Sequence, residues 1–204
     1  MNQFFSRYRL LLSKCLLLSI ILILIISKNN IDNNSMPFVI LEFSGFFLVI
    51  VGVLGRIWSS LYIEGNKTNL LVTNGIYSIC RNPLYFFSFL LLLGYCLLIK
   101  SFIIASMAIL MLIIIYPRTI KYEEEKLLQI HGDDYLNYFN NTPKFIPNLF
   151  LFKKTQKNYK IKIDINKIEN VLIESLGFIL FFEIIRLLNY LHNTNVLSSI
   201  INIY

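Results

Sequence analysis

The sequence predicts an all-α integral membrane protein with about five transmembrane helices. Of its 204 residues, 56% are hydrophobic and only 15% are charged, and the mean hydropathy is +0.62. This balance is too apolar for a soluble domain of this length. Its apolar runs also meet or approach the roughly 20 residues that a helix needs to cross a bilayer. We therefore expect a single membrane domain over residues 1–204.

The predicted spans follow one another in two hairpins and a final helix. In chain order they run over about Leu10 to Ile26, Pro37 to Tyr62, Asn82-Pro83 to Ile99, Phe102 to Tyr116, and residues 170–191. Only Lys100 and Ser101 separate the third and fourth spans, so these two should form a tight hairpin. After Pro117 the pattern stays helical but turns polar, and we expect the fourth helix to project out of the bilayer.

Loop charge predicts the orientation of these helices. Nearly all loop Lys and Arg residues lie in the N-terminal segment and in segments 63–81 and 117–169, whereas the intervening loops hold only Lys28 and Lys100. The positive-inside rule then places the N-terminus and both basic segments in the cytoplasm. The sequence thus predicts a multi-pass protein with a cytoplasmic active site. This site should lie where the third and fourth helices leave the bilayer.

The net charge of +7 suits a membrane surface better than a nucleic acid, because the basic residues stand beside apolar runs, as anionic headgroups favour. We expect no nucleic-acid partner and infer no obligate protein partner. The three cysteines, Cys15, Cys80 and Cys96, have no metal-ligand spacing. Neither a disulfide nor a metal site is predicted.

Two polar segments bracket the second hairpin and should build one pocket. Because the hairpin turn is tight, Arg81 and Asn82 at the start of the third helix should lie close to Glu123 and Glu124 at the exit of the fourth. Asn82 followed by Pro83 favours a helix start whose free N–H groups attract an anion. Arg81 adds a donor fork for a carboxylate, and the two glutamates can accept from an ammonium or from hydroxyls.

These residues also carry a family resemblance. The string G-x-Y-x-x-x-R-N-P-x-Y resembles the signature of the isoprenylcysteine carboxyl methyltransferase and phospholipid methyltransferase families, and the Asn form is similar to their bacterial subgroup. It is made here by Gly75, Tyr77, Arg81, Asn82, Pro83 and Tyr85. A second family pattern is similar to Glu123, Glu124, Leu127, Gly132, Tyr135 and Tyr138. The methyltransferase-like core covers about residues 45–147.

The resemblance implies a cytoplasmic pocket for S-adenosylmethionine and a lipophilic acceptor that enters from the lipid side. The implied cofactor-binding residues are Gly75, Tyr77, Arg81, Asn82, Pro83, Tyr85, Glu123 and Glu124. Asn82 stands where the eukaryotic prenylcysteine enzymes have His, Ile76 where many bacterial members have Pro, and His131 where Phe is usual.

Three residues are candidates for the catalytic step. A carboxylate acceptor, such as a prenylcysteine-like group, needs no base but needs a cation nearby, and Arg118 or Lys121 can supply it. An amine or thiol acceptor needs a proton acceptor, for which Glu124 or His131 is available. Arg56, close to Trp58 at the end of the second helix, can reach the pocket of Arg81. Because the R-N-P motif contains no His, the sequence favours a carboxylate acceptor over an amine or a thiol.

Two other readings stay open at this point. The first is an NADPH-dependent membrane reductase, since sterol reductases have a related helical core with a similar cofactor end. The second is a non-catalytic membrane interaction protein that keeps the scaffold without turnover. Cofactor binding distinguishes the three hypotheses.

Overall fold

The computed structural model describes residues 27–28, 36–63, 70–153, 165–194, 196–197 and 201–202. These residues are predominantly helical, as predicted. The elements are β1 (Ser27–Lys28), α2 (Met36–Ile63), α3 (Ile76–Ile79), α4 (Pro83–Ile99), α5 (Phe102–Asn141), the 3-10 turn η1 (Leu149–Leu151), α6 (Ile165–Asn193) and β2 (Ile201–Asn202). The two short strands pair in parallel. The predicted first span lies outside the described residues.

The apolar helices support a membrane protein. Within the described part of the chain, α2 and α5 are long and apolar enough to cross a bilayer, whereas α4 is apolar but shorter, at 17 residues. Helix α6 carries Glu174, Glu183 and Arg186 along its apolar stretch. The total of about five spans stays a prediction.

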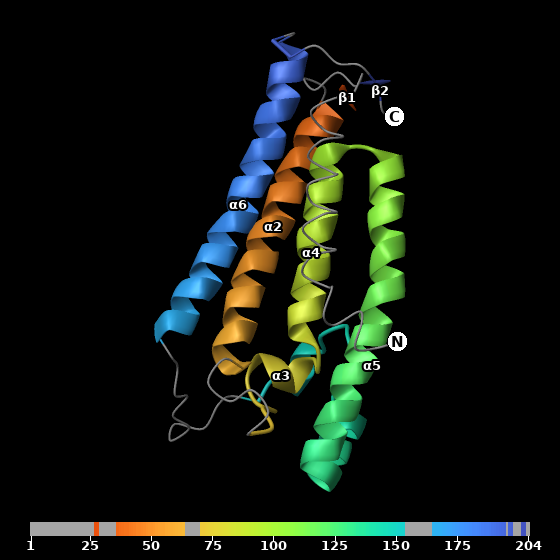
Figure 1. Ribbon diagram of the computed structural model, residues 1–204, viewed down its shortest axis with the longest axis vertical. Coiled ribbons are helices and arrows are strands. Elements are labelled where there is room, and N and C mark those ends of the chain that lie inside the picture. Colours follow the sequence, from red (N-terminus) through yellow and green to blue (C-terminus); the bar gives the residue numbers. More distant parts are fainter. Residues whose placement is uncertain are drawn as a thin grey trace.

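Helices α2, α4 and α6 stand side by side, and α5 follows α4 as the second arm of a hairpin (Figure 1). The hairpin end of the bundle holds the turn at Lys100. The opposite end, which we call the site end, holds the C-terminus of α2 and the N-termini of α4 and α6. Helix α5 continues beyond this end (Figure 1). The predicted helical extension past Pro117 is therefore present.

Glycines allow α2 and α4 to pack closely. A Cβ atom on Gly45 would lie 2.8 Å from the carbonyl oxygen of Gly94, and one on Gly94 would lie 2.6 Å from that of Gly45. Because lipid offers no hydrophobic drive between helices, small residues that let backbones approach are a main source of their association. This contact fixes the position of α4.

Ion pairs join α6 to α2 near both ends. At the site end Arg56 Nη2 lies 3.3 Å from Glu174 Oε2. Toward the hairpin end Arg186 Nε lies 2.7 Å from Glu42 Oε1, and its Nη1 is 3.6 Å from Glu183. Glu183 and Arg186 are three residues apart, a spacing that lets them pair along one helix face. The closer partner of Arg186 is on another helix, which sequence spacing does not reveal.

Helix α5 is kinked at Gly132, whose φ of 52° and ψ of −125° are not helical. The left-handed region suits a residue without Cβ. The last turns of α5 thereby reach α3, where the Tyr138 hydroxyl donates to the Tyr77 carbonyl at 2.7 Å. The kink places the segment after α5 under the site end.

The Glu42–Arg186 pair gives a test of the bundle. We expect Glu42→Gln and Arg186→Gln each to lower the melting temperature in nanodiscs, because each leaves a charge that costs up to roughly 2.5–3.5 kcal/mol in the membrane interior. The double variant should recover the part of the loss that comes from unpaired Glu42, although Glu183 still lacks Arg186. Glu183→Gln, at the longer distance, is the matched control and should lose less. Additive losses in the double variant would contradict the pairing.

Candidate functional site

The start of α4 is built by Asn82 and Pro83. Asn82 occupies the N-cap position and Pro83 the first turn, but the Asn82 side chain makes no capping bond. Its Nδ2 donates instead to Glu124 Oε1 at 3.1 Å and to the Lys144 carbonyl at 3.0 Å. The first-turn N–H groups of α4 therefore have no side-chain cap.

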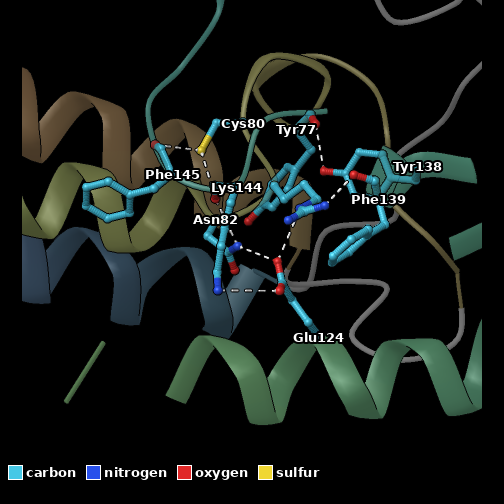
Figure 2. Close-up of polar contacts among 9 residues, drawn as sticks. Tyr77, Cys80, Asn82, Glu124, Tyr138, Phe139, Lys144 and Phe145 are labelled. Atoms are coloured by element: carbon cyan, nitrogen blue, oxygen red, sulfur yellow. Dashed lines mark hydrogen bonds and ion pairs between the residues drawn. The ribbon is translucent and has the colours of Figure 1, made fainter. Parts of the chain in front are cut away.

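The Glu124 carboxylate is the centre of this end of the bundle. Glu124 is 9% exposed, and Asn82 and Lys144 point toward it (Figure 2). Arg81 Nε is 3.2 Å from Oε1, and Lys144 Nζ is 3.9 Å from Oε2. A buried carboxylate is costly unless it is paired and hydrogen-bonded. We call Arg81, Asn82, Glu124 and Lys144 the Glu124 cluster.

Arg81 is held from several sides. Its Nη1 donates to the Phe139 carbonyl, its guanidinium lies 3.8 Å from the centre of the Phe139 ring, and its backbone N–H donates to the Pro143 carbonyl at 2.9 Å. The buried Nε–H makes no hydrogen bond, although Glu124 is within ion-pair distance. The Arg81 guanidinium is thus fixed beside the Glu124 carboxylate by its contacts with Phe139 and Pro143.

A second bridge joins α4 to α5 beside the cluster. The Tyr85 hydroxyl donates to Glu123 Oε1 at 2.9 Å, and the Tyr85 ring packs edge-on against Tyr116 at 5.1 Å. Glu123 is exposed, unlike Glu124. The two adjacent glutamates therefore contact different residues of α4, one at the N-cap and one in the first turn.

Gly75 and Tyr77 lie on the other side of α3, toward α2. Gly75 has a φ of 60°, and a Cβ atom there would meet the Tyr62 ring at 2.4 Å. Its N–H donates to the Lys153 carbonyl at 3.0 Å. Tyr77 is buried, with its hydroxyl 3.4 Å from the Ser59 carbonyl. These contacts position the turn before α4, and they direct Gly75 and the Tyr77 side chain toward α2 and not toward Glu124.

The other predicted catalytic residues are also outside the cluster. Arg56 Nη1 donates to Ser88 Oγ, and its guanidinium lies 4.9 Å from the centre of the Phe178 ring. Together with its ion pair to Glu174, these contacts direct Arg56 between α4 and α6. Arg118 is exposed on α5. Their predicted roles stay predictions, as does cofactor binding by the residues above.

An apolar cleft of about 290 Å³ lies between α4, α5 and α6, next to the Arg56 contacts. Its walls come from Ser88, Leu91, Leu92 and Tyr95 of α4, Leu112 and Tyr116 of α5, and Phe178 of α6. Sequence reasoning missed Phe178, because the sequence does not show which face of α6 meets α4. It also missed Lys144, whose sequence signal is only its place in the polar segment after α5.

A family profile and several known proteins match this chain. The profile of the family described as phospholipid methyltransferase matches residues 41–134. The chain is 29% identical over 163 residues to the nickel-cobalt-cadmium resistance protein NccN of Alcaligenes xylosoxydans xylosoxydans, covering 80% of this chain and 75% of that protein.

Two further relatives are similar. The cobalt-zinc-cadmium resistance protein CzcN of Cupriavidus metallidurans is 28% identical over 78% of this chain and 72% of its own length. The protein-S-isoprenylcysteine O-methyltransferase of Schizosaccharomyces pombe is 37% identical over 40% of this chain and 35% of its own length. No solved structure matches. Among the described residues, no three His, Cys, Asp or Glu side chains gather as metal ligands would.

Cys80 gives a pH-dependent test of burial at the site. Burial raises the pKa of its thiol to about 11, despite the opposing effects of a backbone hydrogen bond at Asn82 and the Arg81 charge. In a Cys15→Ser/Cys96→Ser background, alkylation of Cys80 should be slow near neutral pH and keep rising toward about pH 11, because the thiolate is the nucleophile. In an Asp134→Cys control, the new thiol is exposed on α5, and its alkylation rate should level off above about pH 8.5. Matching profiles would contradict the burial.

Proposed function

Since residues 41–134 of this chain belong to the phospholipid methyltransferase family, we propose that this membrane protein is an S-adenosylmethionine-dependent methyltransferase with a lipophilic acceptor. The single observation that supports it most is the Glu124 cluster. The residues Arg81, Asn82 and Glu124 lie within the matched region and meet across two helices. This is the polar end that a zwitterionic cofactor needs.

The chemistry of the donor set fits S-adenosylmethionine. The Arg81 guanidinium and the first turn of α4, which has no side-chain cap, suit its carboxylate. Glu124 and the Tyr85–Glu123 pair suit its ammonium and ribose hydroxyls. When bound, the cofactor supplies a methyl group on a sulfonium, which makes that methyl electrophilic. The protein contributes orientation and exclusion of water.

The apolar cleft supports a lipophilic acceptor. Its walls are almost entirely apolar side chains of α4, α5 and α6, as a lipid chain requires. Arg56 bonds Ser88 at its edge and pairs with Glu174, so a guanidinium is close to the cleft. This arrangement supports a carboxylate acceptor, such as a prenylcysteine-like group, because a carboxylate arrives deprotonated and needs a cation more than a base. Loop charge supports a site on the cytoplasmic side.

Two of the relatives are named for resistance to metals, and the one named for prenylcysteine methylation matches over a shorter part of the chain. The acceptor should therefore be identified directly. Membranes with and without the protein would be incubated with S-adenosylmethionine labelled in its methyl group, and the lipids extracted. We expect one labelled lipophilic product that depends on the protein, and its loss on mild base would identify an ester.

Cofactor binding tests the proposal against its alternatives. Purified protein in nanodiscs should bind S-adenosylhomocysteine in a calorimetric titration and should not bind NADPH. Binding of NADPH alone would replace the proposal by the membrane reductase. A folded protein that binds neither would be the non-catalytic interaction protein.

Replacing Glu124 tests the pocket itself. We expect Glu124→Gln to weaken S-adenosylhomocysteine binding by roughly 1.5–3 kcal/mol, because a hydrogen bond to a charged group is lost. Glu125→Gln is the matched control, since Glu125 is exposed and pairs with Lys121 along α5 at 3.9 Å. Melting temperatures of both variants would verify folding. An unchanged affinity in folded Glu124→Gln would contradict the assignment.

A further inference from the structure

Three large apolar side chains are exposed after α5. Ile146 and Leu149 are each 74% exposed, and Phe150 is fully exposed at 100%. We call these three residues the apolar knob. Single exposed apolar residues are ordinary, but a contiguous group marks an interaction surface. The knob lies in the segment that follows the kinked end of α5.

Backbone hydrogen bonds hold this segment in place. The Asn148 N–H donates to the Ile79 carbonyl at 2.9 Å, and the Lys153 carbonyl accepts from Gly75 at 3.0 Å. The Asn148 side chain accepts from the Phe150 N–H at 3.1 Å and caps η1. The knob is therefore presented by a fixed backbone.

Aromatic contacts hold the segment against the site-end turns of α4 and α2. Phe145 packs against Phe86 and Phe89 in the first turns of α4, with ring centres 5.7 and 5.9 Å apart. On the α2 side, Phe152 lies 6.3 Å from Trp58. Phe145 lies beside the start of α4 (Figure 2). Aromatic side chains favour the interface between hydrocarbon and headgroups.

The charges around the knob have one sign. Lys144 and Lys153 flank it and are exposed, and the sequence continues with Lys154, Lys157, Lys160 and Lys162. No Asp or Glu occurs between Tyr135 and Ile163. Apolar residues flanked by lysines are complementary to an anionic lipid surface.

We propose that the apolar knob inserts into the headgroup region of the leaflet at the site end, and that Lys153 binds anionic phospholipid headgroups there. The same segment supplies Lys144 to Glu124 and the Pro143 carbonyl to Arg81. Contact with the leaflet thus steadies the part of the loop that closes the Glu124 cluster. The proposal does not depend on the methyltransferase activity.

Fluorescence tests the insertion. Trp58 is the single tryptophan, so a Trp58→Phe/Phe150→Trp variant reports position 150 alone. In nanodiscs its emission should be blue-shifted and quenched by phosphatidylcholine that carries a nitroxide near the headgroup. The control, Trp58→Phe/Asp134→Trp, reports the exposed extension of α5 and should be quenched by aqueous acrylamide. Equal acrylamide quenching at both positions would overturn the proposal.

Headgroup selectivity needs its own comparison. At equal mole fraction, nitroxide-labelled phosphatidylglycerol should quench position 150 more strongly than labelled phosphatidylcholine. Lys153→Gln should reduce this anionic enrichment by up to about fivefold, the ratio that corresponds to about 1 kcal/mol per lysine at a charged surface. Equal quenching by the two lipids would overturn the role of Lys153.

Discussion

Burial of the Glu124 carboxylate determines how the site end of the bundle is assembled. An unpaired charge there would be too costly, so Glu124 needs donors, and they come from segments far apart in the sequence. Arg81 and Asn82 supply them from the start of α4, and Lys144 from the segment after α5. One carboxylate therefore joins both arms of the hairpin to the loop beneath them. The same groups provide the charges that a zwitterionic ligand requires.

Contacts elsewhere in the bundle hold the helices in the positions that the Glu124 cluster requires. The close approach of Gly45 and Gly94 sets α4 against α2, and the ion pairs of Arg56 and Arg186 hold α6 beside them. Because α6 contributes Phe178 to the cleft, a helix outside the family match shapes the surface on which an acceptor would lie. Arg56 therefore has a structural contact, its ion pair with Glu174, and also lies beside the cleft through its hydrogen bond to Ser88.

Sequence reasoning reached the helices and the meeting of Arg81 with Glu124, but not the surroundings of the site. The lengths of the apolar runs predicted the helices. The two-residue turn at Lys100 predicted the meeting of Arg81 with Glu124, because a tight hairpin brings the far ends of its two helices together. The kink at Gly132 could not be foreseen, since a glycine in a helical pattern does not reveal a positive φ. Backbone carbonyls such as that of Lys144 carry no sequence signal. Contacts between helices, including those of Arg56 with α6, depend on rotation about each helix axis, which a sequence of nearly uniform apolarity does not specify.

A double-mutant cycle at Arg81 and Glu124 is the most direct test of the site. The affinity for S-adenosylhomocysteine would be measured in nanodiscs for Arg81→Gln, Glu124→Gln and the double variant. If the two residues act as one cluster, their losses should be non-additive by about 0.5–3 kcal/mol. Fully additive losses would mean that the two side chains act independently, and would contradict a shared cofactor site.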